Sequence, residues 1–122
     1  MSKLSILIVD DEVNVTKSLE RNLRDQFEVF TANSGLEALD ILAKHDIAVI
    51  LADQRMPGME GVELLKAAQK ISPDSRSIIL SGYSDISALV TALNIGSIRG
   101  FMSKPWDMEE LRERLGDAAL EY

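Results

Sequence analysis

Cysteine is absent from this chain of 122 residues, which excludes disulfides and any metal site built from thiolates. A chain without cysteine suits a reducing compartment. No apolar run approaches the roughly 20 residues that span a bilayer, and the opening Met1-Ser2-Lys3 leads directly into a strand-like run rather than a signal sequence. We therefore expect a soluble protein of the cytoplasm.

Basic residues are in the minority, because 13 lysines and arginines stand against 20 acidic residues, for a net charge of -7. The basic residues are also scattered, which disfavours direct binding to nucleic acid or to an anionic membrane. Neither Gly-x-Gly-x-x-Gly nor a P-loop follows any apolar run, and this argues against a nucleotide-binding fold. The chain length fits one domain with a substantial core.

Strand-like and helix-like patterns alternate five times along the chain. The strand-like runs cover residues 5–9, 28–32, 47–52, 77–80 and 100–102. After each run, apolar residues recur at helical spacing, and we interpret them as core: Val15, Leu19, Leu23; Leu36, Leu39, Ile41, Leu42; Val62, Leu64, Leu65, Ala68, Ile71; Ile86, Leu89, Val90, Leu93; Met108, Leu111, Leu115, Ala118. Asn33 or Ser34 would cap the second helix, and Gly96 would end the fourth. This pattern predicts an α/β protein of (βα)5 type, with a parallel sheet between two layers of helices.

Three aspartates stand at the ends of the expected strands, Asp10 and Asp11 after the first run and Asp53 after the third. The carboxyl ends of parallel strands share one edge of a sheet, where ligands bind. Two carboxylates about 4 Å apart repel each other by on the order of 4 kcal/mol at an effective dielectric of about 20, so such a cluster requires a cation. An all-oxygen ligand set favours Mg²⁺. The plainer interpretation is that these are ordinary loop or N-cap acids.

Two further polar residues fall at expected strand ends, Ser81 after the fourth run and Lys104 after the fifth. Taken alone, they have plain interpretations as a turn or capping serine and a solvated lysine. Beside a metal site, a hydroxyl and an ammonium group would donate to phosphoryl oxygens. Together with Asp53 as a carboxylate nucleophile, they suffice for transfer of a phosphoryl group to an aspartate.

Four segments, in order and at appropriate spacing, resemble the receiver domain of bacterial two-component response regulators. They are Ile8-Val9-Asp10-Asp11-Glu12, residues 51–61, Leu80-Ser81-Gly82-Tyr83 and residues 101–106. The resemblance covers essentially the whole chain. It implies a doubly wound, flavodoxin-like three-layer sandwich with strand order 2-1-3-4-5. It also implies a receiver domain over residues 1–122, either standing alone or excised from a longer protein.

The resemblance implies roles for the acids and for one backbone group. Asp53 would be the phosphoacceptor. Asp11, Asp53 and the backbone carbonyl of Arg55 would bind Mg²⁺, or Mn²⁺ in its place, while Asp10 would act mainly through water.

It also implies roles at the ends of the fourth and fifth strands. Ser81 and Lys104 would bind the phosphoryl oxygens, Phe101 would turn inward with Ser81 as a switch, and the Lys104–Pro105 peptide bond would be cis. Ser81 replaces the more usual threonine and lacks a methyl group that restricts its rotamer, so the switch would couple less tightly. Phe101 lacks the hydroxyl of the frequent tyrosine, which excludes any mechanism that needs that group.

Arg55 and Tyr83 occupy positions that tune dephosphorylation in the family. Their bulk would shield the acyl phosphate from water, so we expect the phosphorylated state to outlast that of the Arg55→Ala/Tyr83→Ala variant. Gly82 would leave room for the phosphate. In the turn Met56-Pro57-Gly58, the proline would fix φ and the glycine would allow a close approach. Trp106 would pack at the start of the last helix.

By the same resemblance, the phosphoryl donor is a sensor histidine kinase or a histidine phosphotransfer protein. Phosphorylation would switch the face formed by the fourth helix, fifth strand and fifth helix, which would act on an output domain or protein. Beyond its own phosphorylation and dephosphorylation, we expect no enzymatic turnover. The fourth helix, 86–94, contains no lysine or arginine, which disfavours the charged dimer of one large subclass. We expect a monomer or a weak, phosphorylation-dependent dimer.

Two other classes of function compete with this interpretation. A phosphatase of the haloacid dehalogenase type also uses an aspartyl nucleophile and Mg²⁺, but it needs Asp-x-Asp after its first strand, where this chain has Asp10-Asp11-Glu12. A non-phosphorylated, receiver-like interaction module would keep the fold without the chemistry. The complete set of acids, hydroxyl and lysine argues against such a module.

Overall fold

The computed structural model describes residues 3–82, 98–120 and 122. Five strands form one parallel sheet in the order β2-β1-β3-β4-β5. Their bounds are Ser5–Val9 (β1), Glu28–Ala32 (β2), Val49–Asp53 (β3), Arg76–Ser81 (β4) and Ile98–Ser103 (β5). The third strand begins later than predicted, but the predicted fold class and strand order are confirmed.

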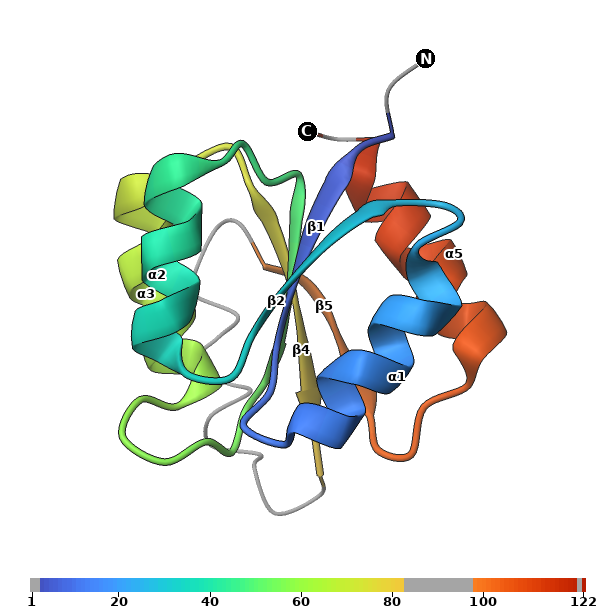
Figure 1. Ribbon diagram of the computed structural model, residues 1–122, viewed down its shortest axis with the longest axis horizontal. Helices are drawn as coiled ribbons and strands as arrows, with labels where there is room; N and C mark the ends of the chain where they lie inside the picture. The colour runs from blue at the N-terminus through green and yellow to red at the C-terminus, as the bar shows by residue number, and fades with distance from the viewer. Residues whose placement is uncertain (1–2, 83–97, 121) are drawn as a thin grey trace.

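Helices cover both faces of this sheet, so the molecule is a three-layer sandwich. The helices are α1 (Val13–Leu23), α2 (Gly35–Lys44), α3 (Gly61–Ile71) and α5 (Met108–Ala119) within the described residues. In Figure 1, α2 and α3 lie against one face, and α1 and α5 lie against the other. The helix expected at 86–94 and its stop at Gly96 lie outside the described residues. Among the helices that are described, none is long and apolar enough to cross a membrane.

Alternating side chains of the central strands build a separate core on each face of the sheet. In β1, Ile6 and Ile8 belong to the core formed with α1 and α5, whereas Leu7 and Val9 belong to the core formed with α2 and α3. Because helices cover both sides, a central strand can be apolar on both of its faces. This arrangement accounts for the unbroken apolar runs that precede Asp10 and Asp53.

Two positions predicted to lie in the core are at the surface instead. Leu36 is 73% exposed and Ile71 is 45% exposed. Leu36 lies in the first turn of α2, where the buried stripe runs through Gly35, Ala38 and Leu42. Ile71 is the last residue of α3 and extends past the end of the covered face. Helical spacing alone overestimated the width and length of the buried stripes.

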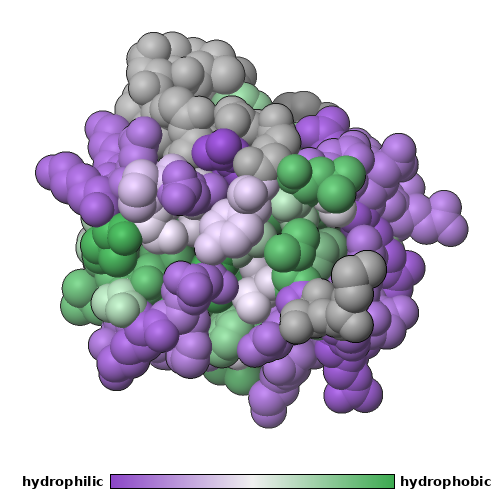
Figure 2. All heavy atoms as spheres, turned by 90° about the horizontal axis from the view of Figure 1, so that it is seen from above, coloured by the Kyte–Doolittle hydropathy of each residue, from purple (hydrophilic) through white to green (hydrophobic). Residues whose placement is uncertain are grey.

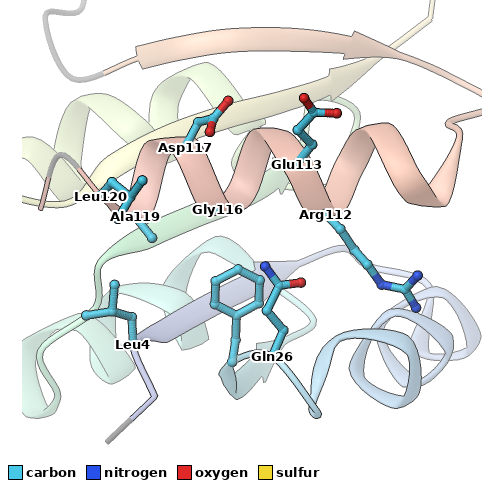
Figure 3. Close-up of a pocket in the computed structure, with 9 residues that line it drawn as sticks. Leu4, Gln26, Arg112, Glu113, Gly116, Asp117, Ala119 and Leu120 are labelled. Carbon is cyan, nitrogen blue, oxygen red and sulfur yellow. The ribbon is translucent and has the colours of Figure 1, made fainter. Parts of the chain in front are cut away.

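The end of the sheet where the strands begin carries a groove between the α1–β2 turn and α5 (Figure 3). Its volume is about 430 Å³, and its lining includes the apolar Leu4 and Leu120 and the acidic Glu113 and Asp117. Figure 2 views this end of the molecule from above and shows hydrophobic atoms in clusters between hydrophilic ones. Residues from near the two ends of the chain therefore meet at one side of the molecule, away from the carboxyl ends of the strands.

Candidate functional site

The three aspartates lie together at the carboxyl edge of the sheet. Asp10 directly follows β1 and Asp53 ends β3, two strands that pair with each other. Both residues are only 3% exposed, whereas Asp11 is exposed. One carboxylate oxygen from each of the three lies within 4.8 Å of the other two. The structure thus brings together the acids that the strand pattern placed at one edge.

Hydrogen bonds from three directions fix the position of Asp10. Its backbone N–H donates to the carbonyl of Ala32 at 3.1 Å, and its own carbonyl accepts from Asn33 Nδ2 at 2.8 Å. The N–H of Glu12 donates to Asp10 Oδ1 at 2.9 Å. Asn33 Nδ2 also lies 3.2 Å from Thr16 Oγ1. Asn33 therefore ties the β1–α1 loop to the end of β2.

Burial disfavours the ionised forms of the two buried carboxyl groups, those of Asp10 and Asp53. It raises the pKa of Asp10 from 3.8 to about 6; the Glu12 N–H and Lys104 act against this rise, while the charges of Asp53 and Asp11 add to it. Burial also raises the pKa of Asp53, against the hydrogen bond and charge of Lys104. A cation would stabilise the ionised forms. The donor set consists of carboxylate oxygens, which fits the hard ion Mg²⁺.

Ser81 and Lys104 lie at the same edge of the sheet. Ser81 ends β4 and Lys104 follows β5, the two strands that lie on the side of β3 away from β1. Lys104 Nζ forms an ion pair with Asp53 Oδ1. Burial acts to lower the pKa of Lys104, but the hydrogen bond and charge of Asp53, together with the charges of Asp10 and Glu12, raise it overall. Ser81 ends β4 and is buried, and its carbonyl accepts from the Lys104 N–H at 3.1 Å. A hydroxyl-bearing residue and an ammonium group thus flank the acids.

The segment that follows β5 lies beside this edge. The peptide bond between Lys104 and Pro105 is cis. Trp106 packs against the core shared with α1 and α5, as predicted, whereas Phe101 is half-buried against the opposite core. Arg114 Nη1 donates to the carbonyl of Phe101 at 3.1 Å. A side hollow of about 300 Å³ lies between this segment and the start of α5.

The loop between β3 and α3 begins with the buried Gln54, which directly follows Asp53, and continues with Arg55, which is exposed. Gly58 has a φ of 82°, which favours glycine, but a Cβ there would meet nothing within 4 Å. The predicted close approach at Gly58 is therefore wrong, and the turn needs its backbone conformation instead. The close approach occurs at Gly61, where a Cβ would lie 2.6 Å from the carbonyl oxygen of Asp53.

A comparison of sequences identifies the family to which this arrangement belongs. The family model for the response regulator receiver domain matches residues 6–116. The chain belongs to this family. It is a receiver domain of two-component response regulators, which are signalling proteins.

Relatives of this receiver domain differ greatly in length. It is 37% identical over 114 residues to the hydrogenase transcriptional regulatory protein HoxA of Cupriavidus necator, a match that covers 93% of this chain and 24% of that protein. It is 33% identical over 114 residues to sporulation initiation phosphotransferase F of Bacillus subtilis, covering 93% of this chain and 91% of that protein. The chain thus spans about a quarter of the length of HoxA and nearly all of the phosphotransferase.

Solved structures agree with the assignment. The receiver domain superimposes on a chain from the adenylate cyclase of Rhodopirellula baltica with a TM-score of 0.94 and 39% sequence identity, covering 98% of this chain and 90% of that one. At this similarity, the fold and strand order are those of the family.

The segment after β4 holds two more of the predicted positions of the receiver domain, Gly82 and Tyr83. Tyr83, predicted to tune dephosphorylation, lies outside the described residues. Gly82 is described, and among the described residues other than its chain neighbours, none lies within 4 Å of a Cβ placed there.

Two residues shape the receiver site in ways that the sequence did not predict, Asn33 and Gln54. Asn33 was considered as a cap of α2, but Ser34 is the cap, since its Oγ accepts from the N–H of Glu37 at 3.1 Å. Gln54 is polar and directly follows a buried strand. That position, together with the helix-start pattern Glu60-x-x-Glu63, is the signal that points to it.

Proposed function

We propose that this receiver domain accepts a phosphoryl group on Asp53 from a phosphohistidine of a partner protein. The observation that carries the proposal is the convergence of three carboxylates within 4.8 Å, one of them ion-paired to Lys104. An oxygen of Asp53 attacks the phosphorus, the bond from phosphorus to the imidazole nitrogen breaks, and an acyl phosphate forms. The receiver domain performs no turnover beyond this phosphorylation and its own dephosphorylation.

Asp10, Asp11, Asp53 and the backbone carbonyl of Arg55 are the groups that would hold Mg²⁺, with Asp10 acting mainly through water. A bound Mg²⁺ would offset the negative charge of the phosphoryl oxygens. Lys104 is already paired with Asp53, so its ammonium group needs only a small shift to donate to the transferred group.

Ser81 is proposed to bind a second phosphoryl oxygen through its hydroxyl group. Drawing that hydroxyl toward the phosphate vacates space for Phe101, whose half-buried ring would turn inward and alter the surface around β5 and α5. The output domain or protein would recognise this altered surface. Arg55 and Tyr83 would slow the attack of water on the acyl phosphate.

The test is the intact mass of the protein after incubation with acetyl phosphate and Mg²⁺. We expect one phosphoryl adduct on the wild type, and none on Asp53→Asn or in the presence of EDTA. Asp25→Asn is the matched control, because Asp25 is an exposed aspartate outside the acid cluster, and it should be modified like the wild type.

An unmodified wild-type protein that is folded and does not bind Mg²⁺ would contradict the proposal. That outcome would favour an interaction module that has the receiver fold without the chemistry. An adduct that persists in Asp53→Asn would instead show that a different side chain is the acceptor.

A further inference from the structure

Gln54 is a fully buried polar residue placed between two residues of the proposed site. It directly follows Asp53, directly precedes Arg55 and is 1% exposed. Its backbone N–H donates to the carbonyl of Leu80 at 2.9 Å, and its carbonyl accepts from the N–H of Gly61 at 3.0 Å. A buried amide side chain is costly unless its polar atoms have partners, so the partners of this side chain need an account.

The side chain of Gln54 links two points at the start of α3. Its Oε1 accepts from the N–H of Val62 at 3.0 Å. This N–H is one of the four at the start of a helix that lack a partner within the helix. Its Nε2 donates to Glu60 Oε2 at 2.7 Å. Together with the backbone bond to Gly61, these contacts close residues 55–59 into a loop whose two ends are fixed to each other.

The Glu60 end of this link is itself held in place. Glu63 Oε1 accepts from the Glu60 N–H at 3.1 Å, and the N–H of Leu64 donates to the Glu60 carbonyl at 2.9 Å. Glu60 is therefore the N-cap of α3, bonded to the first turn of the helix, rather than a freely moving surface acid. The hydrogen bonds of Gln54 therefore fix the backbone on either side of residue 54 relative to the start of α3.

We propose that Gln54 is a positioning residue of the metal site: its side-chain amide holds the β3–α3 loop so that the Asp53 carboxylate and the Arg55 carbonyl face the same ion. This inference rests on the proposed magnesium site. Gln54 itself does not touch the ion. It acts on the two ligands that flank it in the chain, as residues behind metal ligands commonly do.

Only an amide can fill both roles of this side chain, since it accepts at Oε1 and donates at Nε2. Leucine at position 54 would fill much of the same space but leave Val62 N–H and the Glu60 carboxylate without these partners. Glutamate would keep the acceptor for Val62 and place a second carboxylate against Glu60. Exchanging the two residues, as Gln54→Glu/Glu60→Gln, restores one acceptor facing one donor.

The experiment measures the Mg²⁺ dissociation constant of the full chain by calorimetry, alongside the hydrogen exchange of the Val62 amide by NMR. We expect Gln54→Leu to weaken Mg²⁺ binding by about 10–100-fold and to speed exchange at Val62. Gln54→Glu should also weaken binding, and Gln54→Glu/Glu60→Gln should recover most of the wild-type affinity. Recovery by the exchanged pair is a result that a general loss of stability does not produce.

Two control variants separate positioning from stability. Gln69→Leu changes an exposed glutamine on the same helix and should leave the Mg²⁺ affinity unchanged. Leu115→Ala removes a fully buried side chain of α5 and should destabilise the fold without weakening Mg²⁺ binding. If Gln54→Leu does not fold, Glu60→Ala replaces it, because Glu60 is exposed and its loss removes the partner of Gln54 Nε2 without opening a cavity.

Wild-type affinity in a folded Gln54→Leu, or in Glu60→Ala where Gln54→Leu does not fold, would overturn the inference. So would an exchanged pair that binds Mg²⁺ no better than Gln54→Glu. The two failures are distinguishable: a wild type that binds Mg²⁺ but takes up no phosphoryl group counts against the proposed function alone, and the Mg²⁺ affinities of the variants still test the role of Gln54. A wild type that binds no Mg²⁺ overturns both.

Discussion

Asp10 carries a carboxyl group whose pKa is raised by burial to about 6, well above the 3.8 of an unperturbed aspartate. Because the folded protein binds this proton more tightly than the unfolded chain does, unfolding releases it between about pH 4 and pH 6. The tighter proton binding by Asp10 stabilises the folded state. This stabilisation is fully present below about pH 4 and is lost as the pH rises through 6. Without divalent cations, we expect the wild type to lose about 1–3 kcal/mol of unfolding free energy relative to Asp10→Asn across this window.

Urea unfolding of both proteins in EDTA, from pH 4 to pH 7, measures this difference. Asp25→Asn serves as the control, since Asp25 is exposed, and its stability should follow that of the wild type at every pH. Parallel curves for the wild type and Asp10→Asn would mean that the Asp10 carboxyl titrates in the folded protein as it does in the unfolded chain.

Among the elements, the two glycines at Gly61 and Gly116 should respond in opposite ways to alanine. A Cβ at Gly61 would lie 2.6 Å from the Asp53 carbonyl oxygen, so Gly61→Ala pushes α3 away from β3 and should cost about 1–3 kcal/mol. Gly116 lies inside α5, where a Cβ would be 3.4 Å from Gln26 Nε2, the flexible end of a side chain. Alanine is the better helix former, so Gly116→Ala should stabilise the protein by about 0.5–1 kcal/mol.

The measurement is the unfolding free energy of each variant in urea. Two changes of the same sign would contradict the prediction, because they would show that space and helix propensity do not govern these positions. Gly61→Ala should in addition weaken Mg²⁺ binding, whereas Gly116→Ala should not.

How far the sequence predicts these elements depends on how many residues carry each signal. Every position of β1 after Ser5 and of β3 before Asp53 is apolar, so the strand ends at Asp10 and Asp53 could be located. The cap of α2 could not be chosen, because Asn33 and Ser34 are both good N-cap residues and only the tertiary contact of Asn33 with Asp10 separates them. Gln54 was missed because its partners lie six and eight residues further along the chain.

For the whole molecule, magnesium should act as a stabilising ligand. A ligand that binds only the folded state stabilises it by about 2.7 kcal/mol at 100 times its dissociation constant. We therefore expect the melting temperature to rise with MgCl₂ concentration for the wild type and to rise much less for Asp11→Asn, which removes an exposed carboxylate that we propose as a ligand. KCl at matched ionic strength is the control, and an equal rise in KCl would show that general screening, not a bound ion, is responsible.

The overall arrangement was the most predictable part of the molecule, since parallel strands necessarily end at one edge and bring Asp10, Asp53, Ser81 and Lys104 together. The energetic details of that edge were not predictable in the same way. The ion pair between Lys104 and Asp53 and the raised pKa of Asp10 depend on side-chain packing and burial, which no local pattern in the sequence encodes.

The groove on the opposite side is lined by Leu4, from just before the first strand, and by Leu120, from just after the last helix. Because residues 4 and 120 line the same groove, a short glycine-serine linker is long enough to join these two positions. The polypeptide could then be opened elsewhere, for example between the exposed residues His45 and Asp46. Such a circular permutant should retain its phosphorylation chemistry, because the rearranged connections all lie at the end of the sheet remote from the acids.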